Sequence, residues 1–157
     1  MTPTVEPADA PSGRQRPSIL VACRQNAGRS VAGKLLLEYY GQGRVDVRSA
    51  GSTPGDHIHP EVAAELAARG LPTAGESPKL LTREGVEDAD VVITMGCGEA
   101  CTYVPGKRYL DWEVDDPAGQ DPKTVRRIVD DIDARVRALL RELVPDLDPP
   151  PAPAPRR

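Results

Sequence analysis

A chain of 157 residues is long enough for one domain with a substantial core. Its formal net charge of −4 offers no basic surface for nucleic acid, and no apolar run approaches the roughly 18 residues of a membrane span. We therefore exclude nucleic-acid-binding and membrane-spanning proteins and expect a globular monomer. Its core must be largely aliphatic, because the sequence contains no Phe.

The N-terminal segment lacks the apolar stretch of a secretory signal, which predicts a cytoplasmic protein. In that compartment disulfides are rare. The three cysteines are therefore more typical of catalysis or metal binding than of a structural framework.

The first predicted strand is 18–23, SILVAC, whose uninterrupted apolar run is typical of a buried parallel strand. Residues 30–40 repeat apolar side chains at helical spacing, and Gly41 ends that predicted helix. Residues 44–51, RVDVRSAG, alternate with a period of two and predict a second strand.

A second helix is predicted at 59–70, with Pro60 near its start and Gly70 just past its end. Residues 89–96, ADVVITMG, predict another buried strand. The last helix is predicted at 122–143, where one stripe of apolar residues recurs at steps of three and four: Val125, Ile128, Ile132, Val136, Leu139, Leu140 and Leu143.

Strands that alternate with helices predict one α/β sandwich domain with a parallel sheet, here spanning 17–145. The tails outside it, 1–16 and the Pro-rich 146–157, are predicted to be disordered. Ligands of such folds bind at the carboxyl ends of the strands, and Cys23 lies at one such end.

The loop between the first strand and helix, 23–29, has the features of an oxyanion site. Successive backbone N–H groups and a helix N-terminus form a nest for an anion. Gly28 lets the backbone approach closely, and the planar fork of Arg29 can grip two oxygens of a tetrahedral anion.

The same positive field favours Cys23 as the thiolate, the reactive form of a cysteine. Ser30 is placed to donate a hydrogen bond to that sulfur, and the amide of Asn26 to hold the loop in shape. The alternative is a buried structural cysteine beside a surface arginine. The flanking strand and helix favour a nucleophile in a phosphate-like pocket instead.

A thiolate that attacks an oxyanion needs a proton donor for the departing oxygen. Asp116 is the candidate, because the following Pro117 restricts the backbone at that position. The alternative for this residue is an Asp-Pro pair that merely forms a turn.

Two further cysteines, Cys97 and Cys101, follow the third strand, so they should face the same sheet edge as Cys23. On a helix their four-residue step leaves Cβ atoms about 5–6 Å apart, so a disulfide between them requires the segment to bend. The alternatives are a structural thiol pair and a zinc site completed by His57 and His59, whose spacing is unusual for zinc. We interpret the two histidines as shaping the loop before the next helix.

Five segments together carry a family likeness: CRQNAGRS, RSAGSTPGDHIHPE, ESPKLLT, MGCGEAC and DWEVDDPAG. Over residues 17–143 the chain resembles an arsenate reductase built on the low-molecular-weight tyrosine phosphatase fold. The resemblance implies a three-layer α/β sandwich, with a four-stranded parallel sheet flanked by helices. It also implies arsenate as the substrate and a role in arsenic detoxification.

Carried onto this chain, the resemblance implies that Cys23 attacks arsenate and Asp116 protonates the leaving oxygen. Cys97 then attacks the sulfur of Cys23, releasing arsenite, and Cys101 resolves the disulfide, which thioredoxin reduces. The implied substrate-binding residues are those of the loop: Arg24, Gln25, Asn26, Ala27, Gly28, Arg29 and Ser30.

No bound cofactor or metal is expected. Lys34 stands where some relatives carry an acidic residue associated with potassium, so we predict no such ion. Some relatives use a small thiol as the reductant, but usually without the later cysteines, so we favour thioredoxin.

Two other functions stay open. A low-molecular-weight protein tyrosine phosphatase shares the loop, but usually has an aromatic residue after the Asp-Pro, where this chain has Ala118. A non-catalytic module would bind arsenite or zinc through its thiols.

Overall fold

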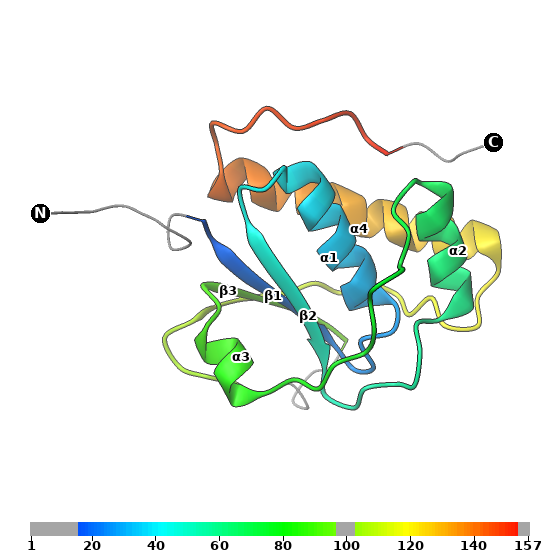
Figure 1. Cartoon of the computed structure of the whole chain (residues 1–157), viewed down its shortest axis with the longest axis horizontal. Coiled ribbons are helices and arrows are strands. Elements are labelled where there is room, and N and C mark those ends of the chain that lie inside the picture. The colour runs from blue at the N-terminus through cyan, green and yellow to red at the C-terminus, as the bar shows by residue number, and fades with distance from the viewer. Residues whose placement is uncertain (1–15, 97–102, 154–157) are drawn as a thin grey trace, which may run out of the picture.

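The computed structural model describes residues 16–96 and 103–153. Strands and helices alternate along most of the chain (Figure 1). In order they are β1 Ser18–Cys23, α1 Arg29–Gly41, β2 Asp46–Gly51, α2 Pro60–Ala68, α3 Arg83–Glu87, β3 Val91–Met95, β4 Arg108–Asp111 and α4 Pro122–Leu143.

The four strands form one sheet in the order β2-β1-β3-β4, and every neighbouring pair is parallel. This confirms the predicted parallel α/β sheet. The central strand β1 ends at Cys23, whose register partners are Gly51 on β2 and Met95 on β3. The loops that follow these three strands therefore meet at one edge of the sheet.

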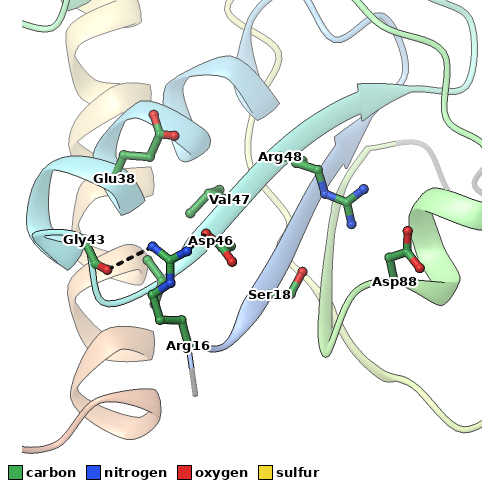
Figure 2. A pocket seen from close by; sticks show the side chains of 9 residues that line it. Arg16, Ser18, Glu38, Gly43, Asp46, Val47, Arg48 and Asp88 are labelled. Carbon is green, nitrogen blue, oxygen red and sulfur yellow. Dashed lines mark hydrogen bonds and ion pairs between the residues drawn. The ribbon is translucent and has the colours of Figure 1, made fainter. Parts of the chain in front are cut away.

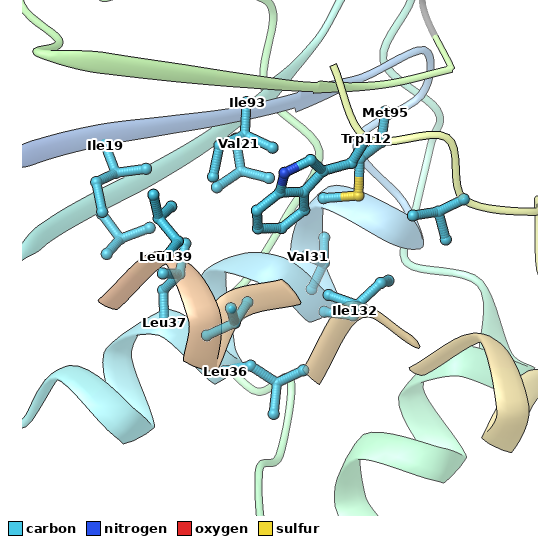
Figure 3. Packing of buried hydrophobic residues seen from close by; sticks show 14 of the residues in the cluster. Ile19, Val21, Val31, Leu36, Leu37, Ile93, Met95, Trp112, Ile132 and Leu139 are labelled. Carbon is cyan, nitrogen blue, oxygen red and sulfur yellow. The ribbon is translucent and has the colours of Figure 1, made fainter. Parts of the chain in front are cut away.

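The helices of the described residues cover the two faces unequally: α1, α2 and α4 lie on one side and the short α3 on the other (Figure 1). Side chains of β1 alternate between these layers, as the strand period requires. Ile19 and Val21 join the larger core between the sheet and α1 and α4, shown in Figure 3, whereas Leu20 packs with Val86 of α3.

The three strands and three helices predicted from apolar periodicity are present, with ends displaced by at most two residues. The sequence pattern did not indicate α3 or β4, which have five and four residues. After α4, part of the Pro-rich segment predicted as disordered lies beside α1. There the hydroxyl of Tyr39 donates to the carbonyl of Pro151 at 2.6 Å, and Leu147 packs against the larger core. Within the described residues, no helix combines the length and apolarity needed to cross a bilayer.

A buried polar pair joins α1 to α4. The hydroxyl of Tyr40 donates to Oδ2 of Asp133 at 2.8 Å, and Arg137 donates to the other carboxylate oxygen at 2.7 Å. Burial and the bond to Asp133 raise the pKa of Tyr40 above its usual value, so its proton stays available for donation.

We expect Tyr40→Phe to lower the free energy of unfolding by about 1–2 kcal/mol, because one buried hydrogen bond is lost while Asp133 keeps Arg137. Urea titration measures this change. Tyr39→Phe is the matched control, since its hydroxyl bonds to the exposed tail and should contribute less. Equal losses in the two variants would show that the buried Tyr40–Asp133 bond stabilises the fold no more than the exposed bond of Tyr39.

Candidate active site

The loop after β1 is held from outside through its carbonyl groups. The carbonyls of Cys23, Arg24, Gln25 and Ala27 accept hydrogen bonds from the backbone of residues 52–59, at 2.7–3.2 Å. These four oxygens are therefore directed toward that segment rather than toward an anion, which they would repel. The loop ends where α1 begins, at Arg29, so the positive end of the helix dipole points at the same place.

Behind the loop, a chain of hydrogen bonds leads to the sulfur of Cys23. The backbone N–H of Lys79 donates to Oδ1 of Asn26, and Nδ2 of Asn26 donates to the hydroxyl of Ser30 at 2.8 Å. The Ser30 oxygen lies 2.9 Å from the Cys23 sulfur. Because that oxygen already accepts from Asn26, its own proton is free to point at the sulfur.

This arrangement separates two predicted substrate-binding residues from the cavity. The side chains of Asn26 and Ser30 are fully buried behind the loop, and neither lines the pocket. Asn26 also adopts a positive φ of 52°. The Asn26 amide thus holds the loop and the Ser30 hydroxyl contacts the Cys23 sulfur, as the sequence predicts for these two side chains, but neither side chain faces the cavity as a substrate contact would.

The pocket beside Cys23 has a volume of about 70 Å³. Its lining includes the predicted nucleophile Cys23 and the predicted proton donor Asp116. It also includes His59 and five of the seven predicted substrate-binding residues: Arg24, Gln25, Ala27, Gly28 and Arg29. A space of this size suits a small tetrahedral anion. The pattern at 23–30 and the Asp116-Pro117 pair thus converge on one cavity.

His59 was interpreted as a loop-shaping residue, and the structure places it in the pocket wall. It lies just before α2, in the connection that follows β2. One signal could have placed His59 there, because loops that follow adjacent parallel strands meet at the same sheet edge. The connection that carries His59 follows β2, and β2 neighbours β1. His57 is exposed and does not line the pocket.

Arg29 is oriented by two contacts from the segment after β4. Its Nη1 donates to the carbonyl of Val114 at 3.2 Å, and its Nη2 lies 3.8 Å from Oδ2 of Asp116. The Arg29 side chain is 13% exposed, whereas that of Asp116 is 60% exposed. The arginine is thus fixed in the wall while the carboxyl stands at the mouth, as a proton donor to a departing oxygen should.

Gly96, the last described residue before Cys97, lies against Arg29. A Cβ at this position would lie 2.9 Å from Cζ of Arg29, and the glycine has a φ of 81°. Only a glycine allows the chain to pass so close to the guanidinium. Cys97 and Cys101, predicted as the second and third thiols of the relay, lie outside the described residues.

Lys34 is paired rather than free. Its ammonium contacts Glu76 at 3.0 Å and Glu38 at 3.2 Å. Burial opposes its charge, but the two carboxylates outweigh burial and raise the pKa of Lys34. The pair with Glu76 ties α1 to the segment that carries Lys79, and thus supports the bond to Asn26.

A larger hollow of about 590 Å³ lies at the opposite end of the sheet, near the starts of β1 and β2 (Figure 2). Both signs of charge line it, and Arg16 already pairs with Asp46 at 3.1 Å. This mixture favours neither an anion nor a cation. Across 16–96 and 103–153, no three His, Cys, Asp or Glu side chains are grouped so as to hold a metal.

Several known proteins resemble this chain in sequence and fold. A putative arsenate reductase of Halobacterium salinarum is 35% identical over 79% of this chain and 91% of its own length. A thioredoxin-dependent arsenate reductase of Corynebacterium glutamicum is 43% identical with a TM-score of 0.72, covering 82% of this chain. The match spans 62% of that protein.

An arsenate reductase of Archaeoglobus fulgidus is 30% identical with a TM-score of 0.68, over 78% of this chain and 98% of its own. The family model described as low molecular weight phosphotyrosine protein phosphatase matches residues 18–148, nearly the whole described domain. Because this match covers most of the chain, the chain belongs to the low molecular weight phosphotyrosine protein phosphatase family.

Proposed function

We propose that this protein reduces arsenate to arsenite, using Cys23 as the nucleophile. The observation that carries the proposal is the cavity itself, in which a nearly buried thiol and a guanidinium fork face a space of oxyanion size. Relatives that are 30–43% identical and bear the name arsenate reductase support arsenate as the anion.

In the first step the Cys23 thiolate attacks arsenic, an S–As bond forms and an As–O bond breaks. Asp116 gives its proton to the departing oxygen, which leaves as water. Arg29 and the loop amides hold the remaining oxygens and the charge that develops on them. Ser30 supports the attacking sulfur from behind.

In the second step the thiolate of Cys97 attacks the sulfur of Cys23. A Cys23–Cys97 disulfide forms, and the electron pair of the broken S–As bond reduces As(V) to As(III), which leaves as arsenite. Cys101 then displaces Cys23 to give Cys97–Cys101, and thioredoxin reduces that bond. The position of Gly96 against Arg29 supports this route, because Cys97 follows it directly. Thiols that must stay reduced fit a cytoplasmic location.

The alternative, a tyrosine phosphatase, would use the same Cys23, Arg29 and Asp116 but no later cysteine. The residues lining the pocket in the described part of the chain include no Phe, Tyr or Trp side chain to hold a phenyl ring. Ala118, after the Asp-Pro pair, supplies none either. The geometry therefore favours the inorganic anion over an aryl ester.

The test is arsenate-dependent NADPH consumption with thioredoxin and thioredoxin reductase. We expect turnover in the wild type, and loss of multiple turnover to background in Cys97→Ser and in Cys101→Ser. In a single turnover Cys101→Ser should still release about one arsenite per protein. Cys97→Ser should release none, since the thiol that attacks the Cys23 sulfur in this scheme is absent.

Hydrolysis of para-nitrophenyl phosphate is the control, because it needs only the shared loop and proton donor. Any such activity should survive both cysteine changes. Arsenate turnover that persists without Cys97 and Cys101 would contradict the relay. Stoichiometric binding of arsenite or zinc without any turnover would instead identify a thiol-based binding module.

A further inference from the structure

The proton donor lies on a loop that is tied to α2. We call residues 115–120 the acid loop. Within it, the N–H of Gln120 donates to the carbonyl of Pro117 at 3.1 Å, and the N–H of Ala118 donates to Oδ1 of Asp116 at 3.0 Å. The N–H of Gly119 is directed outward and donates to a carboxylate oxygen of Glu61, in the first turn of α2.

The start of α2 also contacts residues 23–29, which we call the anion loop. The N–H of His59 donates to the carbonyl of Ala27 at 2.8 Å. A Cβ on Gly28 would lie 3.1 Å from Cδ2 of His59 and 3.4 Å from Cγ of Pro117. The anion loop, the acid loop and the start of α2 therefore meet at Gly28, where they are in close contact.

Glu61 is suited to this contact by its charge. The hydrogen bond from Gly119, and next the one from its own backbone N–H, hold the pKa of Glu61 below its usual value. Nearby His59 acts in the same direction, and burial only partly opposes it. Glu61 is thus a carboxylate at neutral pH, and a carboxylate accepts a stronger hydrogen bond than a neutral group.

Asp116 has few contacts of its own to fix it. Its side chain is largely exposed, and its distance of 3.8 Å from Arg29 is too long for a hydrogen bond. The backbone of the acid loop therefore sets the position of the Asp116 carboxyl over the pocket.

We propose that Glu61 is a positioning residue for Asp116, because its bond to Gly119 holds the acid loop against the start of α2. This inference rests on the proposed role of Asp116 as proton donor. Proton transfer requires donor and acceptor at hydrogen-bond distance, so a displaced acid loop slows the chemical step while leaving the anion contacts of Arg29 intact.

The experiment compares Glu61→Ala, Glu61→Gln and a matched control, Glu84→Ala. Glu84 occupies the first turn of α3 and is exposed, away from the pocket. We expect Glu61→Ala to lower the single-turnover rate of arsenite formation about 10-fold, with KM for arsenate within about twofold of wild type. Glu61→Gln should keep most of the rate, since its amide oxygen still accepts from Gly119. Glu84→Ala should match wild type.

A wild-type rate in Glu61→Ala, or a rise in KM with no change of rate, would overturn the inference. A second readout does not depend on activity. The Gly119 amide resonance should titrate with the Glu61 carboxyl, at an apparent pKa below that of an ordinary glutamate, and this titration should vanish in Glu61→Gln. Its absence in the wild type would also overturn the inference.

Failure of the proposed function looks different. In that case wild type would not reduce arsenate while the Gly119 titration is present. The role of Glu61 would then be tested by measuring para-nitrophenyl phosphate hydrolysis, which needs the same proton donor, in the same three variants. A loss in Glu61→Ala alone would support its positioning role, and equal rates would overturn it.

Discussion

Arg29→Lys should lower kcat/KM for arsenate by about 100- to 1,000-fold, the usual cost of removing a preorganised oxyanion donor. In the structure Nη1 of Arg29 is held by the carbonyl of Val114 and Nη2 points toward Asp116, so the plane of the guanidinium is fixed across the pocket. A lysine keeps the charge but offers a single ammonium, which cannot grip two oxygens and bond to Val114 together.

The effect should appear in steady-state and single-turnover kinetics alike. Arg48→Lys is the control, because Arg48 is exposed on β2, remote from the pocket lining, and should retain full activity. The melting temperature of both variants should stay near that of wild type. Near-native turnover in Arg29→Lys would show that the guanidinium is not needed to bind the oxyanion.

Gly51→Ala should be almost as damaging, with a loss of about 100-fold in kcat/KM, as expected when reacting groups are displaced by about 1 Å. A Cβ at Gly51 would lie 2.7 Å from the carbonyl oxygen of Arg24 and 2.8 Å from backbone atoms of Gln25 and Asn26. All three contacts are with backbone atoms, so a change of side-chain rotamer cannot relieve them. Gly51 is itself fixed in the ladder opposite Cys23, so the anion loop must move.

Gly55→Ala is a closely matched control, because Gly55 approaches the same loop with room to spare. The atoms nearest to a Cβ there would be side-chain atoms of Gln25 and Ala27, at 3.7–3.8 Å. We expect near-wild-type kinetics for it, and a lower melting temperature only for Gly51→Ala. Equal activity of the two variants would show that the loop adjusts freely, contrary to the geometry.

The elements predicted from sequence are those with a strong local signal. The run SILVAC is apolar without interruption after its first residue, the apolar stripe of α4 recurs at helical spacing over the whole helix, and Pro122 marks the helix start. By contrast β4 has four residues with polar ends, and α3 buries only Val86. These two short elements form because β4 pairs with β3 and α3 packs against the sheet. Such contacts between distant segments leave no periodic pattern in the sequence.

The candidate site divides in the same way. Cys23 and Arg29 were found because a strand, a loop and a helix follow each other in the sequence. The placement of Asn26 behind the loop depends on Lys79, more than fifty residues away. The contact between Glu61 and Gly119 depends on two segments that meet only after folding. A glutamate in the first turn of a helix is too common to be a signal by itself.

The central place of β1 in the sheet has a consequence for how the protein moves. Amide hydrogens of β1 are bonded to strands on both sides, so they should exchange with solvent only when the whole domain unfolds. Those of residues 115–120, fastened by a few side-chain bonds, can exchange through local opening. The sulfur therefore stands on the most persistent part of the molecule, and the proton donor on a part that can open and close while the sheet stays intact.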